Sequence, residues 1–527
     1  MKKRWIIIVG LTTVVIAGAA FLFFSHNSAQ TALEETRRAL RQQGFKIDVA
    51  EFDLSASADL RARTAALTNI DLLGSAFRGL DPCRRTEILR QRQELLPTVG
   101  SNAALVVWKQ ERLPPQSGPN YWLPANQFEE DLWSALREVF NEDRAVLDTA
   151  CEAAMSGPIR FNLEARHGTT MFLPHLASLK DLTQIFGIRA VLELHEGNKD
   201  AAWTNLLAST RLITAWDPEP TEVSHGVRFA CTTLAYNATW QALQAGGWAD
   251  DRLAPLQHEW ESVDFFHGLP ETEAFTRACA AAACQLERHE PLSPILFLRE
   301  MRRSPWNAWS EFIEHWRRIR YRHHGSYEDE RVLLLHYQDR ELHLRRAVRS
   351  PTWSEMRPLP GVTNLVPFEP KYHSLVLMML NSRQAGMRFA NRGEGLLGIA
   401  AEAEARRRIL IAAIALERYR GRHGGYPKAL QELVPELLQT PPVDFMDGKP
   451  LRYQLTDDGH FVLYSVGLDC VDDGGNDRWR WRKDPNGPPA MTLQQHSIWS
   501  GRARLPRLRF KPSRRRMKSK PSWNGQP

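Results

Sequence analysis

A run of twenty uncharged and mostly apolar residues, Trp5–Phe24, constrains this chain more than any other part of its sequence. As a helix rising 1.5 Å per residue, it is long enough to cross the roughly 30 Å hydrocarbon core of a bilayer. A cleaved signal peptide has a shorter apolar region that ends at a small-residue exit, whereas Ala17-Gly18-Ala19 lies inside this run. We therefore predict an uncleaved transmembrane helix over residues 5–24, with a cleaved signal peptide and a buried helix as the alternatives.

The charges on the two sides of this run predict which way the chain crosses the membrane. Residues 1–4 form a basic cluster without an acid, whereas residues 34–41 mix two glutamates with three arginines. Because basic flanks tend to stay in the cytoplasm, we predict a cytoplasmic N-terminus and an extracytoplasmic location for residues 25–527. The protein would then be a single-pass membrane protein of the cell envelope.

The net charge of +7 resides in the last part of the chain. Residues 501–527 contain ten Lys or Arg and no acid, so the rest of the chain carries a net charge of −3. Residues 486–527 are rich in Pro, Arg, Lys and Ser and lack a hydrophobic period, so they cannot bury enough apolar surface to offset the entropy of ordering. We predict a disordered basic tail over 486–527, which either binds a polyanion such as anionic lipid, glycan or nucleic acid or only keeps the chain soluble.

Residues 31–384 have the pattern of an α-helical body. Apolar residues recur at helical spacing before Gly197-Asn198 and again after Asp200, which predicts two antiparallel helices, and a third helix should end at Gly246-Gly247. Residues 289–324 interleave tryptophans with arginines, as some nucleic-acid-binding segments do. We interpret this segment as an amphipathic helix and do not expect nucleic acid to be a partner.

The sequence carries no motif of catalysis. Residues 393–398 spell G-x-G-x-x-G, but no buried strand precedes them, as a dinucleotide site requires. The chain has no H-E-x-x-H string, nucleophile elbow or P-loop, and its six cysteines lack the spacing of a metal site. We predict no catalytic residue, no cofactor-binding residue and no enzyme activity, with an anchored hydrolase of envelope polymers as the alternative.

A small α+β domain is predicted over residues 385–485. A helix over Glu402–Arg422 is apolar on several sides and stops at two glycines, so we expect it to pack between its own sheet and the helical body. A short helix is predicted over Ala429–Leu438. Leu451–Leu455 and His460–Val466 then alternate as the two strands of a hairpin.

Several residues of this domain carry a resemblance to a known family. They are Tyr419, Gly425-Tyr426-Pro427, Asp447-Gly448-x-Pro450-Leu451-x-Tyr453, Leu463-Tyr464-Ser465-x-Gly467 and the acidic loop that follows. With these motifs, residues 385–485 resemble the globular domain of the major pseudopilins of type II secretion systems. The resemblance implies a place in a cell-envelope assembly. Because Trp5–Phe24 lacks a pseudopilin's cleavage site and glutamate, we expect a borrowed domain on a larger anchored protein rather than a polymerising pilin.

Four aspartates crowd the loop after the second predicted strand: Asp469, Asp472, Asp473 and Asp477. Calcium takes about six to eight oxygen ligands, which clustered aspartates and turned-in carbonyls can supply. Similar acidic loops bind calcium in the major pseudopilin family. We expect a structural calcium ion here, with Asp469 and Asp472 as the foremost ligands, and a solvated acidic turn is the alternative.

The predicted fold class is therefore mainly α, with an N-terminal transmembrane helix, an α-helical body, a small pseudopilin-like α+β domain and a disordered basic tail. The predicted function is a non-enzymatic interaction or scaffold role in the cell envelope. The membrane and other envelope or secretion proteins are the expected partners. A component associated with a type II secretion-like apparatus is the second interpretation.

Overall fold

The computed structural model describes residues 28–68, 137–138, 140–141, 143–289, 316–362, 395–457, 459–472, 474 and 498–500. These residues are mainly helical, which confirms the predicted helical character, and they include a three-stranded sheet. The predicted anchor, Trp5–Phe24, lies outside the described residues. Within those ranges, no helix is both long and apolar enough to span a membrane.

Helices make up most of the described chain. Besides residues 28–42, they are α2 (Ala58–Thr68), α5 (Arg144–Met155), α6 (His175–His195), α7 (Lys199–Thr214), α8 (Glu222–Ala245), α9 (Asp250–Ser262), α10 (Leu269–His289), α13 (Ser326–Ala347), α14 (Trp353–Met356) and α17 (Leu396–His423). Short 3₁₀ turns are η1 (Val49–Glu51), η3 (Ala165–Thr170) and η5 (Leu430–Leu433). A π-helical turn, η4 (Tyr321–Gly325), leads directly into α13.

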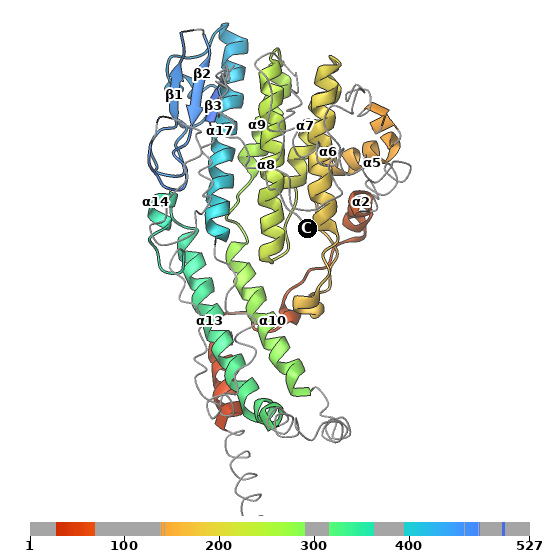
Figure 1. Cartoon of the computed structure of the whole chain (residues 1–527), viewed down its shortest axis with the longest axis vertical. Helices are drawn as coiled ribbons and strands as arrows, with labels where there is room; N and C mark the ends of the chain where they lie inside the picture. The colour runs from red at the N-terminus through yellow and green to blue at the C-terminus, as the bar shows by residue number, and fades with distance from the viewer. Residues whose placement is uncertain are drawn as a thin grey trace, which may run out of the picture.

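The body is a row of packed helices. α6 packs against α7 and α8, while α5 covers α7 and α2 covers α5 and α6 (Figure 1). Gly197-Asn198 separates α6 from α7, and Gly246 ends α8 with a φ of 65°, so the two helix ends predicted from glycine in the body are confirmed. Buried Phe186 and Trp216 lie in the apolar core between these helices.

α17 is covered on both sides. It contacts α8 and α9 of the body, and it also contacts η5 and the sheet (Figure 1). Ile409, Ala413 and Leu416 are fully buried, and one apolar core runs from Trp260 of α9 through α17 to Phe461 of the sheet. The predicted sandwiched helix is confirmed, and the body and the sheet share a core through it.

The sheet has the strand order β1-β2-β3. β1 (Arg452–Leu455) and β2 (Phe461–Tyr464) form the predicted antiparallel hairpin, and β3 (Ile498–Ser500) pairs with the other edge of β2. The predicted disorder of residues 486–527 is therefore wrong for residues 498–500. Isoleucine and tryptophan favour strands, and the open edge of β2 offers backbone groups with which they can pair.

The helix predicted over Ala429–Leu438 is only the turn η5. Pro435 explains the difference, because a proline lacks the N–H of a helical bond and pushes the residue before it out of the helical region. Val434 accordingly has an extended backbone, with φ of −104° and ψ of 138°.

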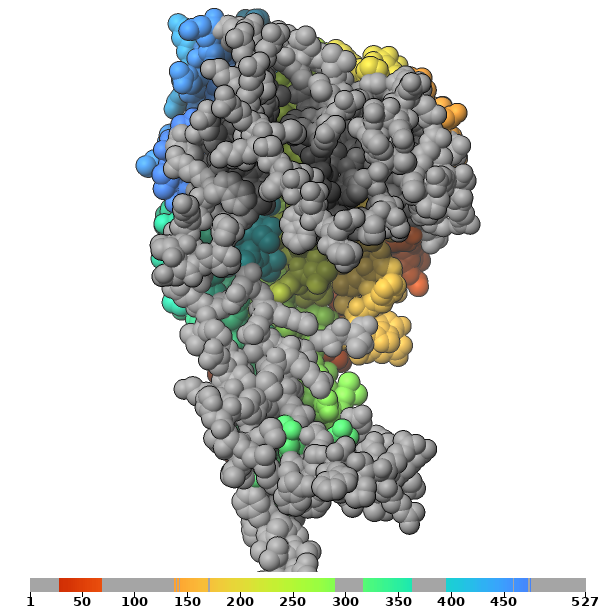
Figure 2. Space-filling view, in the orientation of Figure 1, coloured from red at the N-terminus to blue at the C-terminus, as the bar shows by residue number. Residues whose placement is uncertain are grey.

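Residues 28–42, α10 and α13 project from the body, and we call them the stalk (Figure 1). Leu33 and Leu40 pack with Ala281 of α10 and Leu334 of α13. α13 has 22 residues, so the stalk is about 33 Å long at 1.5 Å per residue. In the space-filling view, atoms of α10 and α13 (green) lie below the body, away from the sheet (blue) (Figure 2).

Buried ion pairs join the helices of the stalk. Glu330 of α13 is fully buried and pairs with both Arg37 and Arg288. Nearer the body, Arg340 of α13 lies 3.1 Å from Glu273 of α10. Such pairs fix the register of the helices, because each charge becomes costly when it is buried without its partner.

Residue 28 lies at the end of the stalk farthest from the body. Arg37 pairs with Glu330 near the start of α13, whereas Gln43 accepts a hydrogen bond from Gln338 Nε2, midway along α13, at 2.8 Å. Residues 28–42 thus run parallel to α13, whose last residues approach the body. The chain therefore enters the described structure at the far end of the stalk.

Candidate functional site

The acidic loop after β2 is held against α14. Gly467 and Cys470 have φ angles of 77° and 60°, so the backbone turns sharply between them. Trp353 Nε1 of α14 donates to the carbonyl of Leu468 at 2.9 Å, and Arg357 Nη1 lies 3.4 Å from the same oxygen. A loop carbonyl that could have faced a metal ion is thus engaged by side chains.

Two of the four predicted calcium ligands lie in the described structure, and Asp473 and Asp477 lie outside it. Asp469 Oδ1 accepts a hydrogen bond from the backbone N–H of Val471 at 3.2 Å. Its carboxylate therefore helps to fold its own loop, as aspartates in turns commonly do.

Asp472, the second of these ligands, is hydrogen-bonded through both oxygens. Its Oδ1 accepts from the Tyr464 hydroxyl at 2.9 Å and from the backbone N–H of Gly474 at 3.0 Å. Its Oδ2 accepts from Arg452 Nε at 3.1 Å. The Gly474 hydrogen bond is the main cause that lowers the pKa of Asp472, with Tyr464 and Arg452 adding to it.

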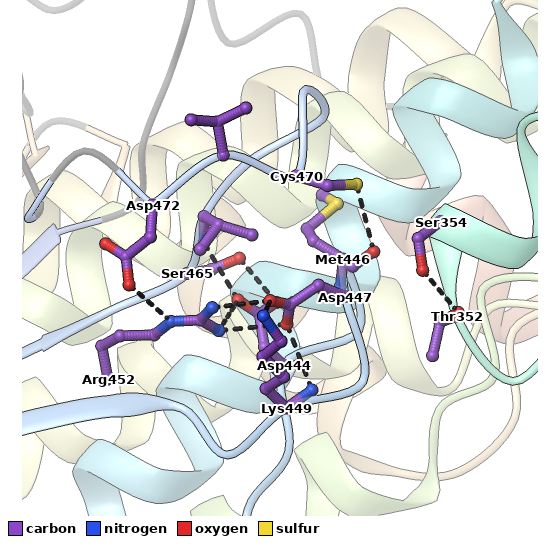
Figure 3. A network of polar contacts seen from close by, with 12 residues as sticks. Thr352, Ser354, Asp444, Met446, Asp447, Lys449, Arg452, Ser465, Cys470 and Asp472 are labelled. Carbon is purple, nitrogen blue, oxygen red and sulfur yellow. Dashed lines mark hydrogen bonds and ion pairs between the residues drawn. The ribbon is translucent and has the colours of Figure 1, made fainter.

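Arg452 lies at the centre of three carboxylates (Figure 3). Besides Asp472, it contacts Asp447 through Nη2 at 2.6 Å and Nη1 at 3.0 Å, and Asp444 through Nη1 at 3.2 Å. The hydrogen bond to Asp447 is the largest of the effects that raise the pKa of Arg452. We call these four residues the Arg452 cluster, and a permanent protein cation occupies its middle.

Asp444 is the buried member of the Arg452 cluster, with no exposed surface. Its carboxylate accepts hydrogen bonds from Ser465 Oγ at 2.7 Å, Val466 N at 2.9 Å and Met446 N at 2.9 Å. A buried carboxylate needs such compensation, because an unpaired charge in the interior is very costly. Asp444 thereby ties the turn before β1 to the end of β2.

The described residues fit a calcium ion only in part. Asp469 and Asp472 each accept a backbone hydrogen bond within the loop, but a metal ion would compete with Arg452 for Asp472 Oδ2. Within the ranges that the structure describes, no three His, Cys, Asp or Glu side chains are grouped so that they could hold a metal ion. The calcium site therefore stays a prediction, and its remaining predicted ligands are Asp473 and Asp477.

Sequence reasoning missed Asp444 and Arg452. Asp447-Gly448 was identifiable as a turn, and Gly448 does adopt a φ of 74°. The further signals were Asp444, three residues before Asp447, and Arg452, at the start of the next strand. Neither signal shows that the end of β2 returns to the same place.

A groove of about 510 Å³ lies between α5, α6 and α7. Its carboxylates include Asp148 and Glu196, which pair with Arg189 at 2.9 Å and with Arg137, respectively. A carboxylate held by a permanent cation is a poor general acid, because the cation favours its ionised form. Asp148 and Glu196 are therefore poor proton donors, whereas Glu193, which also lines the groove, accepts a hydrogen bond from the neutral Asn198 Nδ2 at 3.0 Å.

A second groove, of about 630 Å³, lies between α9, α17 and residues 438–443. Arg407 lines it and is held by both oxygens of Glu404, at 2.7 and 2.8 Å, and by the carbonyl of Trp260 at 3.0 Å. These contacts join α17 to the end of α9. The arginine thus serves the packing of α17 at this place.

A buried histidine and glutamate also meet, which the sequence did not indicate. His175 Nε2 lies 3.0 Å from Glu219 Oε1, and their side chains are 2% and 5% exposed. Neither atom makes an aligned hydrogen bond, and the His175 ring stacks on Phe161 at 4.1 Å. We assign the pair a structural role, because its burial keeps a substrate away from it.

Neither the family models, nor the curated proteins, nor the solved structures with which the chain was compared gave a match.

Proposed function

We propose that this protein is a single-pass membrane protein whose extracytoplasmic part has a non-enzymatic interaction or scaffold role in the cell envelope. The position of residue 28 at the far end of the stalk is the observation that supports it. Phe24 precedes residue 28 by four residues, and four extended residues reach at most about 14 Å. An anchor over residues 5–24 would therefore join the described structure at the far end of the stalk.

An anchor at that place would separate the body from the bilayer. The stalk would act as a spacer of about 33 Å, the length of α13. The body and the sheet would face away from the membrane, where their surfaces are available to partners (Figure 1). Two of the three carboxylates that line the groove between α5, α6 and α7 are paired with arginines, which makes them poor general acids for hydrolysis.

Membrane extraction of the full chain tests the anchor. We expect the protein to stay in the membrane fraction after washing with alkaline carbonate. Replacing Val14 and Val15 with arginine should release it, because each arginine at the centre of a span costs about 3 kcal/mol. Replacing the same two residues with leucine is the matched control and should leave the protein in the membrane.

A reporter fusion tests the orientation. A periplasm-dependent phosphatase fused after Pro485 should be active, and a fluorescent protein that folds only in the cytoplasm should be dark at the same position. The reverse result would contradict an extracytoplasmic body. Release of the unmodified protein by carbonate would contradict the anchor itself.

The second candidate is a component associated with a type II secretion-like apparatus. The supporting observation is the order of α17, a left-handed Gly424 and the β1–β2 hairpin, on which the resemblance to major pseudopilins rests. Crosslinking of the full chain in its own membranes, followed by identification of the crosslinked proteins, tests this candidate. Secretion components among them are the expected result, and their absence from efficiently crosslinked samples would contradict it.

A further inference from the structure

The groove between α5, α6 and α7 receives side chains from all three helices. α7 packs against both α5 and α6 (Figure 1). On each helix, lining residues four positions apart share one face: Arg144 and Asp148 on α5, Arg189 and Glu193 on α6, and Ala201 and Asn205 on α7. The volume of the groove, about 510 Å³, lies within the range of about 300–1,000 Å³ that is common for small-molecule sites. The groove is therefore large enough for a small ligand.

A buried polar atom without a partner lines this groove. Asn205 is 4% exposed, and its Nδ2 donates to the carbonyl of Ala201 at 2.8 Å. This hydrogen bond fixes the orientation of the amide, because an amide oxygen cannot donate to a carbonyl. The other amide atom, Asn205 Oδ1, accepts no hydrogen bond from the protein. Because a buried acceptor is costly without a donor, Asn205 Oδ1 suits a donor of a bound molecule.

Positive charge is in excess where α5 and α6 face the groove. Asp148 lies 2.9 Å from Arg189 and 3.6 Å from Arg144, so two guanidinium groups share one carboxylate. The side chain of Arg189 is 11% exposed, and within the described part of the chain only its Nη2 makes a hydrogen bond. Its remaining N–H groups suit a carboxylate, which a guanidinium can bind with two parallel hydrogen bonds.

Negative charge is in excess at Glu193, one turn further along α6. Glu193 accepts a hydrogen bond from the neutral Asn198 Nδ2, and no cation among the described residues pairs with it. Glu196, in contrast, is held by Arg137. The lining contains three arginines and three acids, so the groove is neutral as a whole but carries separate positive and negative sites. A ligand with one cationic and one anionic group complements this arrangement.

We propose that the groove between α5, α6 and α7 binds a short peptide with free ends. The carboxylate of the peptide lies against Arg189, its ammonium group against Glu193, and a backbone N–H donates to Asn205 Oδ1. A free amino acid has the same two charges, but only a peptide has an amide N–H as well. The inference goes beyond the proposed function and does not depend on the anchor, because all three helices belong to the body.

Isothermal titration calorimetry of the full chain in detergent tests the proposal, with trialanine as the probe. We expect saturable binding of one peptide per chain. N-acetyl-trialanine lacks the ammonium group, and trialanine amide lacks the carboxylate. Each should bind about tenfold more weakly than trialanine, because one charge of the groove then loses its partner. Free L-alanine should also bind more weakly, since it has no amide N–H.

Variants assign each end of the peptide to a residue. Glu193→Gln should weaken trialanine about tenfold and leave N-acetyl-trialanine unchanged, because that peptide has no ammonium group to lose contact. Arg189→Gln should weaken trialanine and leave trialanine amide unchanged. Asn205→Leu should weaken all three peptides, since each keeps its backbone N–H groups. Glu152→Gln, at an exposed position of α5 outside the groove, is the matched control and should change none of these affinities.

The arm with Glu193→Gln remains decisive if a variant at a buried position fails to fold, because Glu193 is only partly buried. Four outcomes would overturn the proposal. They are no saturation by trialanine up to about 10 mM, equal affinities for trialanine and its two blocked forms, L-alanine binding as tightly as trialanine, and equal weakening of trialanine and N-acetyl-trialanine by Glu193→Gln. Release of the chain by carbonate would contradict the anchor and leave the binding of peptide untouched, so the two proposals fail separately.

Discussion

The guanidinium of Arg277 in α10 lies 2.6 Å from the carboxylate of Glu341 in α13, and the two side chains are 0% and 2% exposed. Arg277 also donates two hydrogen bonds, of 2.8 and 2.6 Å, to the carbonyl of Lys46. Arg277 therefore links α10, α13 and the chain that follows residues 28–42. Its removal would leave the Lys46 carbonyl without these two donors and would leave Glu341 with only the half-exposed Arg345.

We expect Arg277→Met to lower the free energy of unfolding by about 3 kcal/mol, because buried Glu341 would keep only the half-exposed Arg345 as a charged partner. Urea denaturation of the full chain in detergent measures this change. The double variant with Glu341→Leu should lose less than the sum of the single variants. Arg166→Met is the matched control, since Arg166 pairs with Glu164 on the surface and should change the stability by less than about 1 kcal/mol. Equal decreases in the free energy of unfolding for Arg277→Met and Arg166→Met would show that the buried pair does not stabilise the fold more than a surface pair.

Replacement of Arg452 should destabilise the Arg452 cluster. Arg452→Met leaves Asp444 buried without its counter-charge, and we expect a local loss of about 3 kcal/mol. Hydrogen exchange of residues 443–472 measures it, with faster exchange expected there and no change in α6 and α7. Lys449→Met is the control, because Lys449 is 74% exposed and lies 4.0 Å from Asp447. Unchanged protection in the Arg452 variant would show that the cluster does not stabilise the hairpin.

Calcium should raise the melting temperature of the protein. Because Arg452 competes for Asp472, we expect a response only at about millimolar calcium, the weak end of natural affinities. Differential scanning fluorimetry in calcium and in EGTA measures the response. Replacing both Asp469 and Asp472 with asparagine should abolish it, whereas Asp457→Asn in the hairpin turn should not. Identical melting curves of the unmodified protein in calcium and in EGTA would contradict the calcium hypothesis.

Stability should fall as the pH rises through the weakly acidic range. Burial is the main cause that raises the pKa of Glu273 from 4.5 to about 7, against the opposing effect of Arg340. The folded protein therefore binds more protons than the unfolded chain between about pH 4.5 and 7, so the contribution of this group is full below that window and is lost above it. We expect a decrease of up to about 3 kcal/mol across the window.

Urea denaturation at several pH values, with Glu273→Gln beside the unmodified chain, measures this dependence. The variant should lack the decrease, because glutamine does not titrate. Glu271→Gln, at an exposed position of the same helix, is the matched control and should keep it. Parallel curves for the Glu273 variant and the unmodified chain would assign the pH dependence to other groups.

Helix ends and the hairpin were predictable because local chemistry determines them. Gly197, Gly246 and Gly424 end their helices in the left-handed region, where glycine is least strained. The alternating strands around Gly459 likewise gave the hairpin. The helix predicted over Ala429–Leu438 was wrong because the effect of Pro435 was overlooked, although the sequence contained it.

The Arg452 cluster and the stalk pairs were not predictable in the same way. Asp444 and Val466 are 22 residues apart, and Arg277 and Glu341 are 64 apart. Periodicity identifies which face of a helix is buried, but it does not identify which charges meet across a tertiary contact. Pairing of this kind depends on helix register, which one sequence does not display.

The burial of α17 also bears on how this protein could be engineered. The segment that begins at Gly395 is not an independent domain, because the side of α17 that contacts α8 and α9 would become exposed without these helices. A graft of that segment onto another carrier would expose the apolar surface of α17 that contacts α8 and α9 to water, and we expect it to aggregate. Shortened versions should therefore retain α8 and α9.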